Sequence, residues 1–599
     1  MAERLSRRRF LRLAALGAVG TVAAACAAPT PEVKVVTKVV KEVVKETVIV
    51  AGTPQVVEKE VTKVVKEEVT KVVEKEVTRI VEKEVAPAVE QVLRIITGSS
   101  GAASFAFNCL VCGSDLQSWM PFLYTPPLYF DKDLKLQFGV FDSYESNDDN
   151  TVWTFHINPK AVFSDGSPIT AADVKGTWEI QIEPVHSPGR IIGYLGNSVG
   201  FAEAREEGAS GEVPGWKVVD EHTIEVSLIN PDPVFHWNIA TCHLPAIKVA
   251  QYKKYDWDTY WLPENNPVFS GPFMLKAYDP DLNTAELVRN PNWWMDEGPY
   301  LDRITFMFVT DTQTRGAMIK NDQADASLGD IPLHMMDEYP GMFREQKQFG
   351  FNLFWLDSKA PPTDDLNVRK ALALSVDWEQ AFAAAFPLAG TGVPTPNLID
   401  PDIPCQDKEQ VWYEYDVEAA KAALAASSYG SAENLPKLRV TPRGTNPAQG
   451  NALEAAMGFW RENLGIVNIE WKQQPDEWVE EDQVLINLSR DDVFVRYPDA
   501  ATYMWKCAHS EGPVASGGLL GGYVNEKVDA LLDEALAIDP DDPRRCELAL
   551  EAQRVFMDDY HTLTFGQEVM RQNVREYVKN MYRGPDVGVV EPWKIKIEK

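Results

Sequence analysis

The sequence predicts an α/β globular part that follows a low-complexity stalk, and three observations support this. Residues 152–157 have the periodicity of a strand, and residues 368–376 and 528–536 have the periodicity of helices. The 599 residues are 45% hydrophobic and 25% charged, which suits a protein with a large core. Charge is unevenly divided: residues 1–31 hold five Arg and one Glu, and residues 32–85 hold eleven basic and eleven acidic side chains. Since the net charge is -31, residues 86–599 must carry -35, so the globular part is the acidic part.

The acidic charge and the lack of catalytic sequence motifs exclude several classes of function. A strongly acidic surface repels phosphate backbones, so we expect no nucleic-acid partner. The chain has no H-E-x-x-H, G-x-S-x-G, P-loop or G-x-G-x-x-G motif, and its eight His are scattered. We therefore expect no catalytic residues, no metal site and no cofactor.

The first 26 residues have the pattern of an export signal. A basic segment, Ser6-Arg7-Arg8-Arg9-Phe10-Leu11, precedes the apolar stretch 13–25, which is too short to span a bilayer. The basic segment resembles a twin-arginine signal, and an ordinary secretory signal is the alternative. Cys26 ends the stretch in a site that resembles a bacterial lipobox, with Ala23 where that site usually has Leu. We expect lipid attachment at Cys26, with simple cleavage after Ala25 as the alternative.

Residues 27–91 are predicted to form a stalk. Residues 56–87 repeat an eight-residue unit, VVEKEVTK, and a degenerate version covers 33–50. Apolar pairs at this spacing drift around a helix, and repeated Val lowers helix propensity. We interpret the segment as a charged spacer that raises the acidic part above a membrane. The alternative is an unusual coiled coil that oligomerises the protein.

The globular part contains a clear strand, turn and helix. Residues 152–157 alternate, with Trp153, Phe155 and Ile157 on one face, as in a half-buried strand. After the turn at 164–168, Thr170 and Asp173 form a capping-box pattern before a helix. The first predicted strand is 92–97, directly after the stalk.

Two further helices are predicted from their apolar spacing. The apolar positions of each follow the i, i+3, i+4, i+7, i+8 rule. They are Val368, Ala371, Leu372, Ser375 and Val376 in the first helix and Val528, Leu531, Leu532, Ala535 and Leu536 in the second.

Five segments, in order along the chain, resemble the solute-binding proteins of family 5. These proteins are the extracytoplasmic receptors of peptide and nickel ABC importers. The segments are WTFHINPKAVFSDGSPITAADV (153–174), SGPFMLKAYDPDLNTAELVRNPNWW (270–294), FNLFWLDSKAPPTDDLNVRKALALSVD (351–377), YEYDVEAAKAALAASSYG (413–430) and YVNEKVDALLDEAL (523–536). The resemblance covers about residues 92–599.

The resemblance implies a two-lobed, periplasmic-binding-protein-like (Venus flytrap) α/β fold with an extra subdomain in lobe one. We place lobe one at 92–136, 268–347 and 560–599, the inserted subdomain at 137–267, and lobe two at 348–559. The crossings between lobes are expected near 349–356 and 562–568. Such a receptor closes on its ligand, because contacts to both lobes exist only in the closed state.

The resemblance also implies a ligand cleft with candidate residues from lobe two. The segment from Val493 to Asp499 resembles the "w-x-x-D-Y-p-D/E-P" segment of peptide-binding members, in which the Asp holds the α-ammonium of the peptide. Arg496 occupies that position here, before Tyr497. An Arg repels an ammonium, so an anion or a hydroxyl-rich sugar becomes a candidate solute. The alternative is that Arg496 forms a structural ion pair with Asp491, Asp492 or Asp499.

Aromatic residues and one loop complete the candidate site. Trp355 lies in an expected crossing and Trp505 follows the turn at Tyr497–Asp499; for both, core packing is the alternative to ligand contact. The loop 105–115 of lobe one offers Phe105, Phe107 and Asn108, or else packs on its own lobe. Cys109 and Cys112 are a candidate disulfide of this loop, although sequence alone does not pair the exported cysteines.

The predicted function is that of an importer receptor. We expect a monomer on the outer face of the cytoplasmic membrane, in the periplasm or at the cell surface, held by its lipid anchor. Its partners would be a peptide or other small-molecule solute and the ABC permease subunits. The alternatives are a ligand sensor of the same fold, coupled to a signalling partner, and a stalked surface hydrolase.

Overall fold

The computed structural model divides the chain into two compact units, Met1–Ala88 and Val89–Lys599. It describes residues 38–50, 53–65 and 90–599, apart from 98–106, 111–118, 184–188, 207–208, 210, 333, 346–348, 389, 395–397, 400–402, 407–409, 442–446, 472–487, 496, 513–522, 570 and 585–587.

The described part of the first unit is an antiparallel hairpin. Strands β1 (Lys38–Val50) and β2 (Thr53–Val65) pair along their whole length, from Val50 opposite Thr53 to Lys38 opposite Val65. Repeated β-branched Val favours this extended backbone. A coiled coil would need helix here, so the coiled-coil alternative does not fit residues 38–65. The repeats from residue 66 to residue 87 lie outside the described residues.

The second unit contains three main sheets, which we use to name its parts. Lobe one is built on a seven-stranded sheet in the order β10-β11-β12-β3-β13-β21-β14. Its strands are β3 (Val92–Thr97), β10 (Phe273–Asp279), β11 (Thr284–Arg289), β12 (Arg303–Phe308), β13 (Ala326–Ser327), β14 (Phe343–Glu345) and β21 (Arg571–Val574). Strand β3 is parallel to both of its neighbours, and the other pairs are antiparallel.

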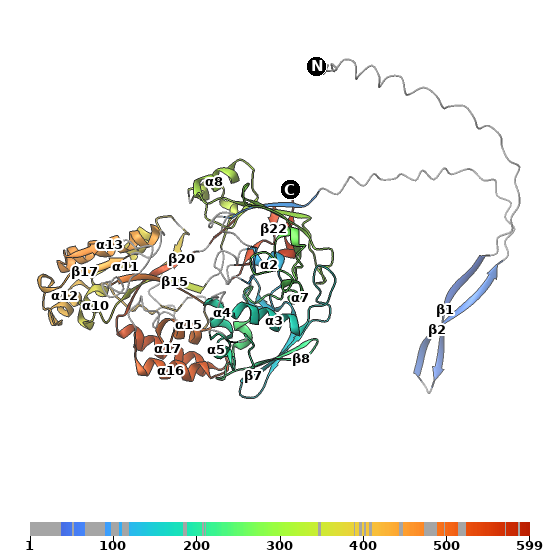
Figure 1. Cartoon of the computed structure of the whole chain (residues 1–599), viewed down its shortest axis with the longest axis horizontal. Helices are drawn as coiled ribbons and strands as arrows, with labels where there is room; N and C mark the ends of the chain where they lie inside the picture. Colours follow the sequence, from blue (N-terminus) through green and yellow to red (C-terminus); the bar gives the residue numbers. More distant parts are fainter. Residues whose placement is uncertain are drawn as a thin grey trace, which may run out of the picture. The chain divides into compact units, whose positions relative to one another are not determined.

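Lobe two is built on a six-stranded sheet in the order β16-β20-β15-β19-β17-β18. Its strands are β15 (Phe349–Leu356), β16 (Gly392–Val393), β17 (Leu438–Thr441), β18 (Ile469–Trp471), β19 (Leu488–Val495) and β20 (Thr562–Glu568). Its helices are α10 (Leu366–Leu374), α11 (Trp378–Ala385), α12 (Val417–Ala426), α13 (Pro447–Leu464), α15 (Ala500–Ala508), α16 (Glu526–Leu536) and α17 (Pro543–Asp558). Helices α15, α16 and α17 pack on one another (Figure 1).

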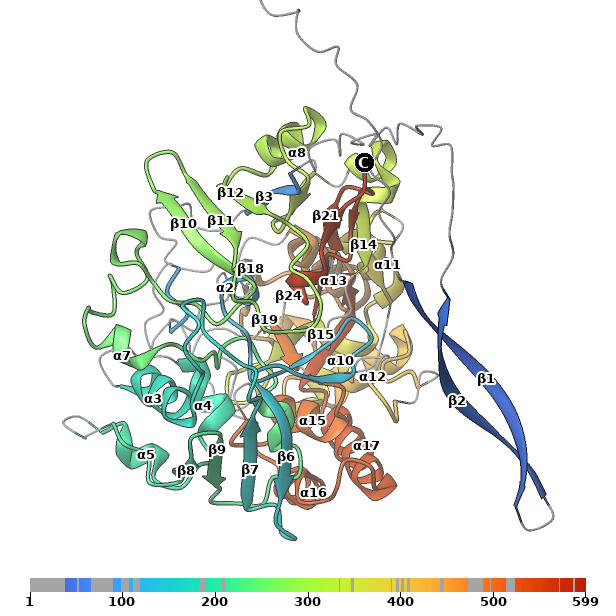
Figure 2. The same cartoon turned by 90° about the vertical axis from the view of Figure 1, so that its right-hand side faces the viewer.

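The inserted subdomain lies in sequence between β3 and β10. Its antiparallel sheet has the order β6-β7-β9-β8 and contacts helix α3, as Figure 2 shows. These elements are β6 (Phe141–Ser146), β7 (Val152–Ile157), α3 (Ala171–Ile182), α4 (Gly189–Leu195), α5 (Phe201–Ala204), β8 (Trp216–Asp220), β9 (Thr223–Ser227) and α6 (Phe235–Asn238). The core of this subdomain begins at Leu128, earlier than the expected boundary at residue 137.

The remaining elements are short. They are α2 (Met120–Leu123), β4 (Leu128–Phe130), β5 (Leu136–Phe138), α7 (Val249–Tyr252), α8 (Thr312–Lys320), α9 (Met335–Glu338), β22 (Val578–Lys579), β23 (Tyr582–Arg583), β24 (Val589–Val590) and β25 (Lys596–Ile597), with 3₁₀ turns at Pro263–Asn265, Pro340–Met342, Ala432–Asn434 and Pro592–Lys594. Within the described residues, no helix combines the length and the apolar character that crossing a membrane requires.

Several local predictions are confirmed. Strand β7 buries Trp153, Phe155 and Ile157 on one face. Thr170 and Asp173 form both hydrogen bonds of a capping box at the start of α3. The apolar faces of α10 and α16 pack in the core of lobe two, with Leu531 and Leu536 only half-buried.

The strands expected as crossings are β15 and β20. They pair antiparallel with each other inside the sheet of lobe two. Strand β20 therefore belongs by its hydrogen bonds to lobe two, although the expected boundary placed residues from 560 onward in lobe one. The role of these strands as the hinge stays a proposal.

One disulfide joins two parts of lobe two. Cys405, in the loop before α12, is bonded to Cys546 in α17, and their Cα atoms are 5.9 Å apart. The two residues are 141 positions apart, and sequence spacing alone did not pair them.

Candidate functional site

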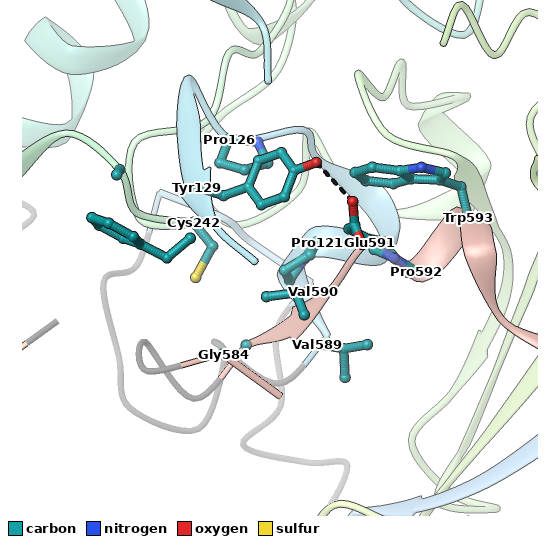
Figure 3. Close-up of a pocket in the computed structure, with 13 residues that line it drawn as sticks. Pro121, Pro126, Tyr129, Cys242, Gly584, Val589, Val590, Glu591, Pro592 and Trp593 are labelled. Atoms are coloured by element: carbon teal, nitrogen blue, oxygen red, sulfur yellow. Dashed lines mark hydrogen bonds between the residues drawn. The ribbon is translucent and has the colours of Figure 1, made fainter. Parts of the chain in front are cut away.

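A small hollow of about 40 Å³ opens between lobe one and the inserted subdomain. Segments far apart in the sequence form its wall, namely α2, β4, residues 240–242 and the stretch around β24 (Figure 3). The lining residues are Pro121, Pro126, Tyr129, Phe130, Ala240, Cys242, Gly584, Gly588, Val589, Val590, Glu591, Pro592 and Trp593. Most of these side chains are apolar, so the hollow suits an apolar group of a ligand.

One polar pair lies in this apolar wall. The hydroxyl of Tyr129 donates a hydrogen bond of 3.1 Å to Glu591 Oε1, which also lies 2.6 Å from Lys594 Nζ. Burial and then the Glu591 charge hold the pKa of Tyr129 far above its usual value, so its hydroxyl stays protonated. Trp593 packs edge-on to Tyr129 with ring centroids 5.9 Å apart. The pair gives the hollow one hydrogen-bonding point among apolar contacts.

Tyr497 of lobe two lies next to this wall. Phe130, which lines the hollow, stacks on the Tyr497 ring with centroids 6.5 Å apart. The Tyr497 hydroxyl donates to Asn238 Oδ1 over 2.8 Å, and its ring lies 5.4 Å from that of Trp237. Tyr497 is only 3% exposed and belongs to the core of the inserted subdomain. These contacts are all with protein, and ligand contact by Tyr497 stays a prediction.

Asp499 is fully engaged in structural contacts. Its carboxylate accepts two hydrogen bonds from Arg545, of 2.9 and 2.7 Å, and caps α15 by accepting from the Thr502 backbone nitrogen and hydroxyl. Burial alone would raise the pKa of Asp499, but Arg545 and Thr502 hold it below its usual value. These contacts favour a structural role, and ligand contact by Asp499 stays a prediction. The Asp-x-x-Thr spacing was a capping signal that sequence analysis overlooked.

A second carboxyl, that of the half-buried Asp232, lies close to this pair. Asp232 of the inserted subdomain accepts hydrogen bonds from the Val234 backbone nitrogen and from Asn238 Nδ2, both 3.0 Å. Burial raises the pKa of Asp232 to about 6, and the charge of Arg545 opposes this rise. A carboxyl of the inserted subdomain therefore lies within the electrostatic reach of an arginine of lobe two.

Two candidates from lobe one lie in its core. Phe107 is fully buried and packs on Trp119 at 4.7 Å between ring centroids. Asn108 donates to the Trp257 carbonyl and accepts from the Leu110 backbone and the Tyr260 hydroxyl. These contacts fit the packing alternative, and neither residue lines the hollow.

The two tryptophan candidates also have packing partners. Trp355 is 1% exposed and lies edge-on to Phe556 and His561. Trp505 is half-buried on α15 and stacks on His509 at 5.5 Å. Their contact with ligand stays a prediction.

The remaining candidates cannot be placed. Arg496, Phe105, Cys112 and Cys26 lie outside the described residues. Cys109 is buried with its Sγ 3.5 Å from the Tyr260 hydroxyl, and its pairing with Cys112 stays a prediction. Of the three acids proposed as structural partners of Arg496, Asp499 is already held by Arg545.

Sequence reasoning predicted none of the residues that line the hollow. Phe130, Ala240, Cys242 and Val589 belong to three separate segments, and no local motif marks any of them as a site residue. Among the described residues, no cluster of His, Cys, Asp and Glu is arranged to hold a metal ion.

Comparison with known proteins gives a consistent result. The sequence model of the bacterial extracellular solute-binding proteins, family 5 (middle region), matches residues 135–513. The periplasmic oligopeptide-binding protein OppA of Escherichia coli is 26% identical over 351 residues, which are 56% of this chain and 63% of OppA, less than two thirds of its length. OppA of Haemophilus influenzae is 25% identical over 480 residues, 76% of this chain and 84% of that protein.

Solved structures share the fold. The Escherichia coli murein tripeptide binding protein MppA superposes with a TM-score of 0.68 at 20% identity, covering 86% of this chain and 99% of that one.

Proposed function

Because the chain belongs to the bacterial extracellular solute-binding proteins of family 5, we propose that it is the extracytoplasmic receptor of an ABC importer. In this proposal it captures a peptide-like solute between its two lobes and delivers it to a membrane permease. The family match, which spans the inserted subdomain and most of lobe two, carries the proposal. The relatives compared above are named for the binding of oligopeptides or a murein tripeptide. Other relatives are named for the binding of dipeptides, haem or glutathione.

The hollow beside Tyr497 is our candidate for a part of the solute site. It has an apolar wall and one polar pair, a combination that suits a small apolar group of a peptide. It borders the place where lobe two meets the inserted subdomain, so closure would bring residues of lobe two against a solute held there. The protein binds its solute and does not transform it in this account.

We further propose that Arg496 sets the polarity of the site. An Arg in place of the ammonium-binding Asp favours a solute that presents a carboxylate, a phosphate or dense hydroxyls. Arg496→Ala should then lower affinity roughly 30-fold or more, as expected for loss of a charge-assisted anchor. Arg496→Asp should recover some affinity for free amino termini. A large loss of stability in ligand-free Arg496→Ala would instead support the structural ion pair.

Export and anchoring complete the proposal. The signal-like residues 1–26 would direct export, and a lipid on Cys26 would hold the protein at the outer face of the cytoplasmic membrane. Cys26→Ala should release the protein from the membrane fraction. If Cys26→Ala stays in that fraction and the mature N-terminus carries no lipid, the anchor is excluded.

Isothermal titration calorimetry tests the central function. Purified protein without its stalk should bind one or more members of a set of two- to five-residue peptides with a stoichiometry of one. The absence of heat with all peptides, together with tight binding of a sugar or a free anion, would replace peptide by that solute class.

A further inference from the structure

One tyrosine of lobe two completes the core of the inserted subdomain. Among the described residues, the buried members of that core cluster lie between Leu128 and Ala246, except for Tyr497. Between Tyr497 and Asn238 lie 258 intervening residues, yet the Tyr497 hydroxyl donates to Asn238 Oδ1 over 2.8 Å. Phe130 and Trp237 enclose the ring of Tyr497. This contact joins lobe two directly to the inserted subdomain. Along the chain, these two parts are connected through residues of lobe one.

Both ends of the contact are held rigidly. Asn238 Nδ2 donates to Asp232, which fixes the amide so that its oxygen faces Tyr497. On the other side, the Tyr497 carbonyl accepts from the Asp499 backbone nitrogen over 2.9 Å, and Arg545 holds the Asp499 carboxylate. Neither side chain is free to rotate, because both are held by other hydrogen bonds. A displacement of lobe two is therefore transmitted through this bond to the inserted subdomain.

We propose that Tyr497 is a positioning residue that latches the inserted subdomain to lobe two and so stabilises the arrangement in which the two meet. Breaking the Tyr497–Asn238 bond weakens this arrangement relative to an opened one. Tyr497 also directly follows Arg496 in the sequence. The link to solute affinity rests on the proposed function; the latch itself rests on the contacts among Tyr497, Asn238 and Asp232.

Amide hydrogen exchange on the ligand-free protein tests the latch. Tyr497→Phe removes the hydroxyl and keeps the ring. Exchange should then rise roughly two- to tenfold in residues 234–240 of the inserted subdomain and in α15 of lobe two, the factor that corresponds to one neutral hydrogen bond. Asn238→Ala should raise exchange in the same two segments, and the double variant should add little to either single variant.

Tyr413→Phe is the matched control. Tyr413 is also a buried tyrosine of lobe two, and its hydroxyl contacts Met557 Sδ at 3.8 Å within the same lobe. This variant should change exchange in lobe two only. If Tyr497→Phe raises exchange in α15 but leaves residues 234–240 at the wild-type rate, Tyr497 serves lobe two alone and the latch is refuted. Full additivity of the two single variants would refute it as well.

Calorimetry separates the latch from the proposed function. If peptides bind, Tyr497→Phe should weaken their binding roughly two- to tenfold, the same factor as the expected rise in exchange. If no peptide binds but exchange changes as expected, the proposed function fails and the latch stands. If peptide affinity is unchanged while exchange changes as expected, the latch does not contribute to solute capture.

Discussion

Arg545 holds Asp499 in a bidentate, buried ion pair that fastens three helices of lobe two together. Arg545 Nε and Nη2 lie 2.9 and 2.7 Å from the two carboxylate oxygens, and the side chains are 2% and 7% exposed. Arg545 Nη1 also donates to the carbonyls of Ala535, Leu536 and Ile538 at the end of α16. Asp499 is the N-cap of α15 and Arg545 lies in α17, so the pair positions the start of α15, shortly after Tyr497.

Removal of Arg545 should therefore be costly. Arg545→Met leaves the Asp499 carboxylate buried without its cation, and we expect the free energy of unfolding to fall by about 3–5 kcal/mol. Urea denaturation measures this. Arg544→Met is the neighbouring control, because Arg544 is exposed and its ion pairs with Glu534 and Glu547 are long, 3.5 and 3.6 Å; it should change stability by less than about 0.5 kcal/mol. If both variants lower the free energy of unfolding equally, the buried ion pair stabilises the fold no more than the exposed one does.

The disulfide should contribute substantially to the stability of lobe two. A bond between residues 141 positions apart restricts the unfolded chain, and its loss typically costs about 2–5 kcal/mol. Reduction should lower the melting temperature of the wild type. The double variant Cys405→Ser/Cys546→Ser should melt at that lower temperature and be insensitive to reductant. Alkylation of both thiols in unreduced, natively exported protein would contradict the pairing.

Acid should destabilise the fold through His561. This residue is fully buried between Trp355 and Tyr523, and neither ring nitrogen has a hydrogen-bond partner among the described residues. Burial, and then the charge of Arg369, lower the pKa of His561 from 6.5 to about 3. The unfolded chain therefore binds a proton below pH 6.5 that the folded protein does not bind until about pH 3.

This difference predicts the sign of the pH dependence. The neutral, buried His561 makes its full contribution to the free energy of unfolding above pH 6.5. As the pH falls toward 3, this contribution is lost, by up to about 1.4 kcal/mol per pH unit. His561→Phe keeps an aromatic ring and should lose less stability over this range than the wild type. Parallel curves of unfolding free energy against pH for the two proteins would rule out this role.

Filling the hollow should impair binding without unfolding the protein. Val590, in β24, lines the hollow and is only half-buried. Val590→Trp should reduce solute affinity roughly 10- to 100-fold, the effect expected when a ligand must displace a bulky side chain. Val467→Trp, at a valine that is 77% exposed on lobe two, should bind as the wild type does. Unchanged affinity in Val590→Trp would remove this hollow from the solute site.

Local periodicity predicted local structure well. Strand β7, the capping box of Thr170 and Asp173 and the buried face of α10 each depend on a few neighbouring residues, so the sequence displays them directly. The ordered family segments then predicted the two-lobed fold, which the solved structures share.

Contacts between distant segments were much less predictable. The pairing of Asp499 with Arg545, the bond from Tyr497 to Asn238 and the bridge from Cys405 to Cys546 join residues 46, 259 and 141 positions apart. No periodic pattern encodes such distances. Asn108 is a different case, because its side-chain amide already bonds to Trp257, Leu110 and Tyr260, which fits the packing alternative; ligand contact by Asn108 stays a prediction.

Mass spectrometry of the ligand carried by natively exported protein tests the central claim most directly. The protein should be purified under mild conditions, denatured, and its released small molecules identified, with the Val590→Trp variant as a low-affinity reference. We predict peptides that are abundant in the wild-type sample and depleted in the variant. Wild-type protein that carries no peptide, but retains one sugar or one inorganic anion at a stoichiometry near one, would contradict a peptide receptor.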